Sequence, residues 1–283
     1  MLVLEGTKRF STFCYNYPSY GISERARRVL VAQDLDQKCQ MIDALVKEYR
    51  EGTLSVDTVV GHVPDYPGRP NTYSSRSIPP SSSSKAAKFP VAVVMLHGIC
   101  HAESYAVDLF LDLLARFGQK SAELPQAFYD DFVEVCRQEA DHFSKWRDRL
   151  GELGVEYGAL PTHDGLWRAA YETRGDLLER LCVINMVHEA RGLDTYPLSR
   201  KKLVNARDLE SVAIIDKNFE EEIEHVSKGV RWFTYVCEQR RLDAKATFQA
   251  IVKSYMKLPL KGPFNEEARD RAGFHRSWYM ELT

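Results

Sequence analysis

Apolar residues recur at helical spacing along most of the chain, and the alternation typical of strands is nearly absent. The pattern predicts a first helix over residues 23–51, with Ser23 as its cap and Gly52 at its end. Longer helices are expected over residues 90–117, 125–150, 166–191 and 208–240, and a short one over 243–256. Gly192 should end the third of the longer helices, so residues 193–206 are expected to form a loop. Four helices of about 25 residues, each about 38 Å long, suit an all-α four-helix bundle.

One segment departs from this pattern. Residues 61–84 contain five prolines and a serine run, which cannot form a helix or the core of a sheet. The expected organisation therefore has four parts, which are an N-terminal helical extension (1–60), a Pro/Ser-rich connector (61–89), the bundle (90–242), and a C-terminal helix and tail (243–283).

The composition is that of an ordinary globular protein, with 44% hydrophobic and 28% charged residues. The net charge of −2 gives no general argument for nucleic acid or an anionic membrane as a partner, although a local basic patch stays open. Six cysteines, none in a C-x-x-C pair, indicate reduced thiols in an intracellular and most simply cytoplasmic protein. No membrane span is expected, and the first 20 residues do not resemble a secretory signal. Lys8 and Arg9 leave an organellar address open, and Glu5 argues against one.

Two predicted helices carry the same short motif. Glu139 precedes His142 by three residues, and Glu222 precedes His225 by three. In a helix this spacing puts both side chains of a pair on one face. A single Glu-x-x-His is most often part of a solvated helix surface, but two on long helices of one predicted bundle indicate a shared site.

The other two long helices each offer a carboxylate for the same site. Glu103 lies among apolar residues, and Glu189 follows an almost wholly apolar run from residue 181 to 187. Glu103 precedes Glu139 by 36 residues and Glu189 precedes Glu222 by 33, so a carboxylate followed by Glu-x-x-His occurs twice at nearly equal spacing. Two such helical hairpins packed face to face would bring six side chains together. Glu221, four residues before His225, is an alternative to Glu222.

Four carboxylates and two imidazoles form a ligand set suited to iron or manganese. Four negative charges buried together are prohibitive without cations, and two divalent metals cancel them. A single zinc ion would leave much of the set idle, because zinc prefers four ligands. We therefore expect two metal ions, iron first, with manganese or a mixed Mn/Fe pair as alternatives.

Several segments resemble an uncharacterised ferritin-like family over about residues 20–280. They are HGICHAESYAVDL, QEADHF, YGALPTHDGLW, HEARGLDTYP, EEIEHVSKGVRWF and GPFNEEARDRAGF, together with Gly68-Arg69-Pro70. The resemblance implies a ferritin-like bundle with a di-metal carboxylate site whose ligands are Glu103, Glu139, His142, Glu189, Glu222 and His225. The chain departs from the pattern at Glu221, where Asp is expected, and in a Ser-rich insertion after Pro70. A more distant likeness, to the di-iron tRNA isopentenyladenosine hydroxylase, does not fix the substrate.

Four further residues are expected around the ligands: His101, His188, Arg191 and Asp194. His101 lies about 200° around the helix from Glu103, so it should orient a neighbour or sit at an interface rather than bind the same metal. His188 could likewise orient a ligand. A structural ion pair with Asp176 or Arg180 is the simpler interpretation of Arg191 and Asp194.

The tail has two interpretations. Asn265, Arg269 and Arg271 could cover the mouth of the bundle and meet an anionic substrate, or they could belong to a solvated surface.

These features favour an oxygen-dependent oxidoreductase that hydroxylates or desaturates an unknown organic substrate. Electrons would come from a partner reductase, because no nucleotide-binding fingerprint is present. Three alternatives remain. One is a metal or peroxide handling protein, such as a ferroxidase or a catalase relative. Another is a tRNA-modifying hydroxylase, which the charge does not encourage, and the last is a binding scaffold with a structural site.

Overall fold

The computed structural model describes residues 21–56, 61–70, 88–118, 124–256 and 259–283. In these ranges the regular elements are all helical, and the one strand-like feature is an isolated bridge between Gly21 and Ser55. The all-α prediction is therefore confirmed. The expectations for residues 1–20 and for most of the connector, residues 71–87, lie outside the described residues.

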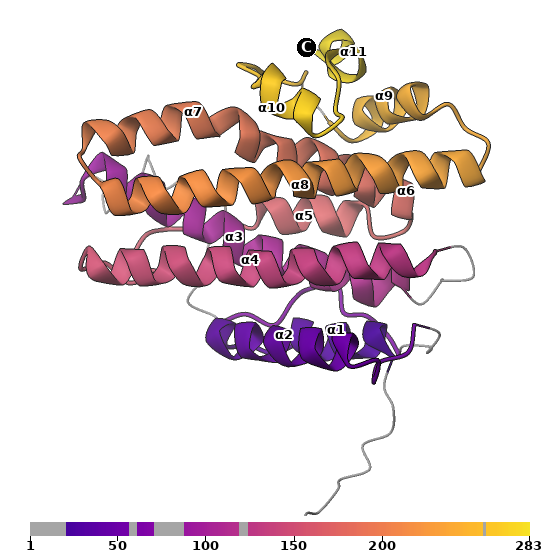
Figure 1. Cartoon of the computed structure of the whole chain (residues 1–283), viewed down its shortest axis with the longest axis horizontal. Helices are drawn as coiled ribbons and strands as arrows, with labels where there is room; N and C mark the ends of the chain where they lie inside the picture. The colour runs from indigo at the N-terminus through magenta and orange to yellow at the C-terminus, as the bar shows by residue number, and fades with distance from the viewer. Residues whose placement is uncertain (1–20, 57–60, 71–87, 119–123, 257–258) are drawn as a thin grey trace, which may run out of the picture.

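Four long helices run lengthwise beside one another through the middle of the molecule (Figure 1). They are α3 (Val91–Phe117), α4 (Gln126–Glu152), α7 (Glu189–Asn205) and α8 (Leu209–Gln239). We call them the central helices. Contacts join α3 to α4, α7 to α8 and α4 to α8, so the four enclose a common interior. Trp146 of α4 and Trp232 and Phe233 of α8 are buried in the core.

The N-terminal helix expected over residues 23–51 is two helices, α1 (Ile22–Leu30) and α2 (Leu35–Arg50). Asp34 begins α2 by accepting a hydrogen bond from the backbone N–H of Gln37 at 2.8 Å. The break gives room to a distant part of the chain. The N–H of Gly68 donates to Leu30 O at 2.9 Å, and a Cβ at Gly68 would overlap the carbonyl of Val31.

The prediction for the third bundle helix, residues 166–191, is also wrong, because both its start and its end differ in the structure. A short α5 (Gly165–Glu172) is followed by a turn, and a continuous helix then runs from residue 177 to 205. Its parts are α6 (Leu177–Arg180), the π-helical η5 (Leu181–His188) and α7. Gly192 does not end this helix, and the expected loop over residues 193–206 is helical to Asn205.

The continuation of α7 past Gly192 and Pro197 has a physical reason. Proline has no N–H, so the carbonyl of Leu193, four residues earlier, loses its helical partner. The side chain of Asn265 replaces it and donates to Leu193 O at 3.2 Å. In addition, α7 packs along α8, where Tyr196 stacks on Phe219 with ring centroids 3.7 Å apart. Tertiary contacts thus outweigh two residues that favour a helix end.

The C-terminal part adds α9 (Ala244–Tyr255), α10 (Glu266–Arg271), α11 (Arg276–Tyr279) and the 3₁₀ turn η6 (Met280–Leu282). The helix expected over residues 243–256 matches α9, which Asp243 caps. The five cysteines in the described ranges form no disulfide with one another. Within the same ranges no helix has the length and hydropathy to cross a membrane.

Candidate metal centre

The structure brings all six predicted ligands together among the central helices. Their donor atoms form two overlapping groups of four, and within each group these atoms lie within 4.8 Å of one another. Both groups contain Glu139 and Glu222. The first group is completed by Glu103 and His142, and the second by Glu189 and His225. Each group could therefore hold a metal ion, and the two groups share two carboxylates.

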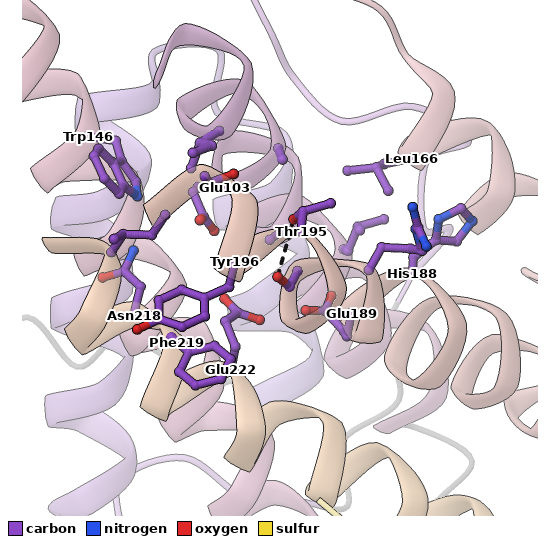
Figure 2. Close-up of a pocket in the computed structure, with 18 residues that line it drawn as sticks. Glu103, Trp146, Leu166, His188, Glu189, Thr195, Tyr196, Asn218, Phe219 and Glu222 are labelled. Atoms are coloured by element: carbon purple, nitrogen blue, oxygen red, sulfur yellow. Dashed lines mark hydrogen bonds between the residues drawn. The ribbon is translucent and has the colours of Figure 1, made fainter. Parts of the chain in front are cut away.

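Each central helix contributes to the cluster as the motif spacing predicts. Glu103 comes from α3, and the two Glu-x-x-His pairs come from α4 and α8. Glu189 is the first residue of α7, directly after the π-helical η5. Short π-helical segments are frequent at functional sites. In Figure 2 the carboxylates of Glu103, Glu189 and Glu222 lie around one space.

The two imidazoles are held by residues on the opposite helix. His142 of α4 donates its Nε2–H to Glu221 of α8 at 2.7 Å. His225 of α8 donates its Nε2–H to Oε1 of Gln138 on α4 at 2.9 Å. Because these bonds occupy Nε2, the lone pair of each ring lies on Nδ1, where it is available to a metal.

Sequence reasoning missed the role of these two orienting residues. Gln138 and Glu221 both stand directly before the glutamate of a Glu-x-x-His motif. Each binds the histidine of the other motif, so the pairing is reciprocal. The shared position was the signal, visible in QEADH and EEIEH, although the sequence suggested Glu221 as an alternative ligand rather than as the partner of His142.

The Nδ1 atoms face the carboxylates. His142 Nδ1 lies 3.4 Å from Glu222 Oε1 and 3.8 Å from Glu103 Oε2. His225 Nδ1 lies 2.9 Å from Glu139 Oε1, without the alignment of a hydrogen bond. Both Nδ1 atoms and both oxygens of Glu139 are buried and have no hydrogen-bond partner. Leaving such groups unsatisfied costs about 1–3 kcal/mol each, and a cation between them removes that cost. The residues therefore fit a metal site.

The outer carboxylates favour the protonated form when the cluster is considered without cations. Burial raises the pKa of Glu103 well above its usual value, and the charges of Glu139 and Glu222 raise it further. Glu189 behaves in the same way, with burial first and the same two neighbours next. Cations bound here would displace these protons.

The shared carboxylates and the imidazoles stabilise one another's charged forms. Burial raises the pKa of Glu139, and so does the charge of Glu222, but the nearby imidazoles of His142 and His225 outweigh both and the pKa is lowered. The pKa of Glu222 is also lowered, by the same two histidines against the effect of burial. For His142 and His225 burial lowers the pKa, and the adjacent carboxylates reverse the shift and raise it.

Of the two places expected for His101, beside a ligand or at an interface, the structure shows the second. Its Nδ1 accepts a hydrogen bond from the Tyr157 hydroxyl at 2.9 Å, and its Nε2 donates to the carbonyl of His163 at 2.7 Å. His101 therefore fixes the loop between α4 and α5. His97 does the same one turn earlier, where its Nε2 accepts from Gly158 N at 2.9 Å.

The expected ion pair between Asp194 and Arg180 is not formed. Asp194 instead accepts two hydrogen bonds from Arg269, at 2.8 and 2.7 Å, and a weaker one from Arg191 at 3.2 Å. Arg180 pairs with Asp112. Asp194 thus anchors the C-terminal tail to α7.

The three tail residues that could have met a substrate all have structural partners. Arg269 is buried, so it cannot meet an anionic substrate. Asn265 caps α10. Arg271 lies on the surface, where it pairs with Glu220.

A cavity of about 290 Å³ adjoins the cluster on the side of Glu103, Glu189 and Glu222. His188 and Arg191 line it, so these two predicted residues lie beside the centre without a hydrogen bond to a ligand in the described part of the chain. Figure 2 shows Trp146 and Asn218 on one side of the carboxylates, with Leu166 and His188 on the other.

Comparison with known proteins places the chain in a family without assigning an activity. An uncharacterized protein of Haemophilus influenzae is 34% identical over 223 residues, which cover 77% of this chain and 76% of that protein. No solved structure matches the chain. Residues 31–280 match the family model described as "Protein of unknown function (DUF455)". The chain therefore belongs to the DUF455 family of proteins of unknown function.

Proposed function

We propose that the central helices form a ferritin-like four-helix bundle that holds two metal ions, in the first instance iron, and that the protein is an oxygen-dependent oxidoreductase. The observation that carries the proposal is the pair of overlapping ligand groups that share Glu139 and Glu222. A structural site for one ion needs about four ligands, whereas this cluster gathers six.

The charges and the donor atoms favour a redox metal. Four carboxylates at one point need about four positive charges, which two divalent ions supply. Carboxylate oxygens with imidazole nitrogens suit iron or manganese better than softer, thiolate-binding metals. The five cysteines in the described ranges are absent from both ligand groups.

Some residues of this chain would bind the metal ions, and others would orient the ligands or exclude water. Glu103, His142, Glu189 and His225 would each serve one ion, while Glu139 and Glu222 would bridge the two. Gln138 and Glu221 keep the imidazoles oriented. Aliphatic and aromatic side chains around the cavity would exclude water from the reacting side.

When bound, the metal pair would supply the redox chemistry that reduces O₂. Two electrons and two protons would come from outside the centre. In a hydroxylation, one oxygen atom enters a C–H bond of the substrate and the other leaves as water. In a desaturation, the substrate loses two hydrogen atoms and both oxygen atoms leave as water. The electrons would come from a separate reductase.

Metal analysis tests the proposal directly. Protein loaded with Fe(II) under anaerobic conditions and desalted should retain about two iron ions per chain. Glu139→Ala and His142→Ala should each lose at least half of that metal, because they remove a shared or a terminal ligand. Glu224→Ala is the matched control, since Glu224 lies exposed on α8 between Glu222 and His225.

Fewer than one metal ion per chain in the wild-type protein would overturn the proposal. Oxygen uptake then separates the reaction classes. With a chemical reductant in excess, an oxygenase centre should consume O₂ repeatedly. Without reductant and with Fe(II) in excess, a ferroxidase should instead accumulate Fe(III) beyond two ions per chain.

A further inference from the structure

The cavity beside the cluster has mainly apolar walls. Its lining includes Ile99, Ala106, Leu109, Trp146, Ile215 and Phe219. These residues come from α3, α4 and α8, and α7 closes the remaining side. The space lies between these helices and opens to solvent along α7, where Arg191, Gly192 and Thr195 are exposed.

Outside the carboxylates of the cluster, three polar side chains on these walls have partners within the protein. The Asn218 amide donates to Ile214 O at 3.1 Å and accepts from Trp146 Nε1 at 3.0 Å. The Tyr196 hydroxyl donates to Asp216 at 2.8 Å, and the Thr195 hydroxyl donates to Gly192 O at 3.2 Å. A ligand with many polar groups would lose its hydration here without gaining equivalent hydrogen bonds.

Arg191 and His188 leave room for one polar group of a ligand at one end. Arg191 Nη1 donates to Lys261 O at 2.7 Å and to Asp194 at 3.2 Å, and the side chain is 44% exposed. His188 lines the cavity near Leu166 (Figure 2).

Gly192 opens the wall formed by α7. It lies inside a continuous helix and its φ is not positive, so the backbone itself does not require glycine. Glycine at such a position costs about 0.5–1 kcal/mol relative to alanine. A Cβ at Gly192 would lie 3.8 Å from Glu222 Oε2, so a longer side chain would extend over that carboxylate. The missing side chain keeps the path from solvent to Glu222 open.

We propose that this cavity is the substrate site, that it binds a small and predominantly apolar organic molecule, and that Gly192 is the opening that admits it. This inference rests on the proposed function, because it assigns the substrate class of that centre. An apolar cavity of about 150 Å³ binds benzene, so a cavity of about 290 Å³ has room for about ten non-hydrogen atoms. One aromatic ring with a short side chain, or a hydrocarbon chain of similar volume, has this size.

Calorimetric titration of the full chain with two matched probes tests the ligand class. Ethylbenzene is apolar and benzamide has nearly the same shape, but benzamide carries an amide that must be desolvated. We expect ethylbenzene to bind about ten-fold more tightly, in Mn(II)-loaded and in metal-free protein, because the amide loses its hydration without gaining equivalent hydrogen bonds; ten-fold corresponds to about 1.4 kcal/mol. Equal affinities, tighter binding of benzamide, or no binding of ethylbenzene would overturn the proposal.

Two variants test the opening. Gly192→Leu should lower the affinity for ethylbenzene at least ten-fold, because its side chain reaches over Glu222. Gly151→Leu is the control, since Gly151 is also helical and exposed but has no atom within 4 Å of its Cβ position. Gly192→Ala fits the 3.8 Å space, so it should fold and bind with only a small loss. Unchanged affinity in Gly192→Leu would overturn the role of Gly192.

Measurement of bound Mn(II) distinguishes a failure of the cavity proposal from a failure of the metal-centre proposal. Gly192→Leu should retain the wild-type amount of Mn(II), which shows that the variant is folded and its ligands are in place. If the wild type binds ethylbenzene but no metal, the proposed function fails while the cavity remains a site for apolar molecules. If it binds metal but not ethylbenzene, the substrate class is wrong and the metal centre stands.

Discussion

The two histidines of the cluster have different orienting partners, a carboxylate for His142 and an amide for His225. A carboxylate that accepts the Nε2–H makes the imidazole a stronger base and a better metal ligand than an amide does. The two metal positions should therefore differ in affinity, with the Glu103–His142 group the tighter one. The residue types of the two groups do not distinguish the two positions, since each group consists of three glutamates and one histidine.

Substitution of each orienting residue should weaken one metal position and leave the other nearly unchanged. Glu221→Gln keeps an acceptor for His142 but removes the charge, and Gln138→Leu removes the acceptor for His225. Changes at such positions lower metal affinity by about 10–100-fold. Competition titration with a chelator should resolve one weakened and one normal equivalent in each variant.

Glu224→Gln is again the control on the exposed face of α8 and should titrate like the wild type. Loss of both equivalents together in Glu221→Gln, or no change in Gln138→Leu, would contradict the reciprocal pairing.

At the scale of the elements, residues 61–70 hold the N-terminal helices against α3. Lys38 of α2 is fully buried, and its Nζ donates to Gly68 O at 2.6 Å and to Asp108 Oδ1 at 2.5 Å. Arg69 donates to the other oxygen of Asp108 at 2.7 Å. The charge of Asp108 is thus shared by two cations, which makes this buried network tolerable. It ties α2 and the segment containing Gly68 to a central helix that carries Glu103.

Gly68→Ala should destabilise the fold by about 1–3 kcal/mol or more, because its Cβ would overlap backbone atoms of Val31 and Ala32 that cannot rotate away. Gly61→Ala, seven residues earlier, has no atom within 4 Å of the new Cβ and should be nearly neutral. Urea denaturation followed by circular dichroism measures both. Similar unfolding midpoints for the two variants would show that the backbone between α1 and α2 shifts to accommodate the new Cβ at little cost in stability.

The same region shows why local sequence rules fail for some helix ends. The apolar spacing over residues 23–51 fits one helix, and only the return of Gly68 explains the break after Leu30. Gly192 fits a helix end, and only the packing on α8 and the hydrogen bond from Asn265 explain the continuation of α7. Both causes lie far away in the sequence, so no window of neighbouring residues contains them.

At the scale of the whole molecule, the clustering of the six side chains was predictable because helix periodicity and chain order determine it together. Two Glu-x-x-His motifs and two carboxylates at similar spacing can meet only if the hairpins pack face to face, as they do. The cavity was not predictable in this way, because its walls come from several helices and its volume depends on side-chain packing. The burial of Arg269, which neither interpretation of the tail included, was not predictable for the same reason, since it depends on how the tail folds back.

The tail in fact supports the cavity wall from outside. Arg269 of α10 forms a two-fold hydrogen-bonded ion pair with Asp194 of α7, and the exposed fractions of the two side chains are 3% and 1%. Aromatic rings surround the guanidinium, with centroids 4.8, 5.1 and 4.5 Å away in Phe264, Phe274 and Tyr279. Asp194 stands between Gly192 and Thr195, two residues that line the cavity. The anchor of the tail is therefore also a fixed point of the wall.

Arg269→Ala should cost about 3–5 kcal/mol of unfolding free energy, because it leaves the buried Asp194 carboxylate without its main partner. Arg271→Ala removes only an exposed pair with Glu220 and should change stability by less than about 1 kcal/mol. The double variant Arg269→Met with Asp194→Leu removes both charges and should recover much of the loss. Hydrogen exchange should show faster exchange in α7 for Arg269→Ala alone. Equal stabilities of the Arg269→Ala and Arg271→Ala proteins would mean that the tail does not brace the helix that carries Gly192.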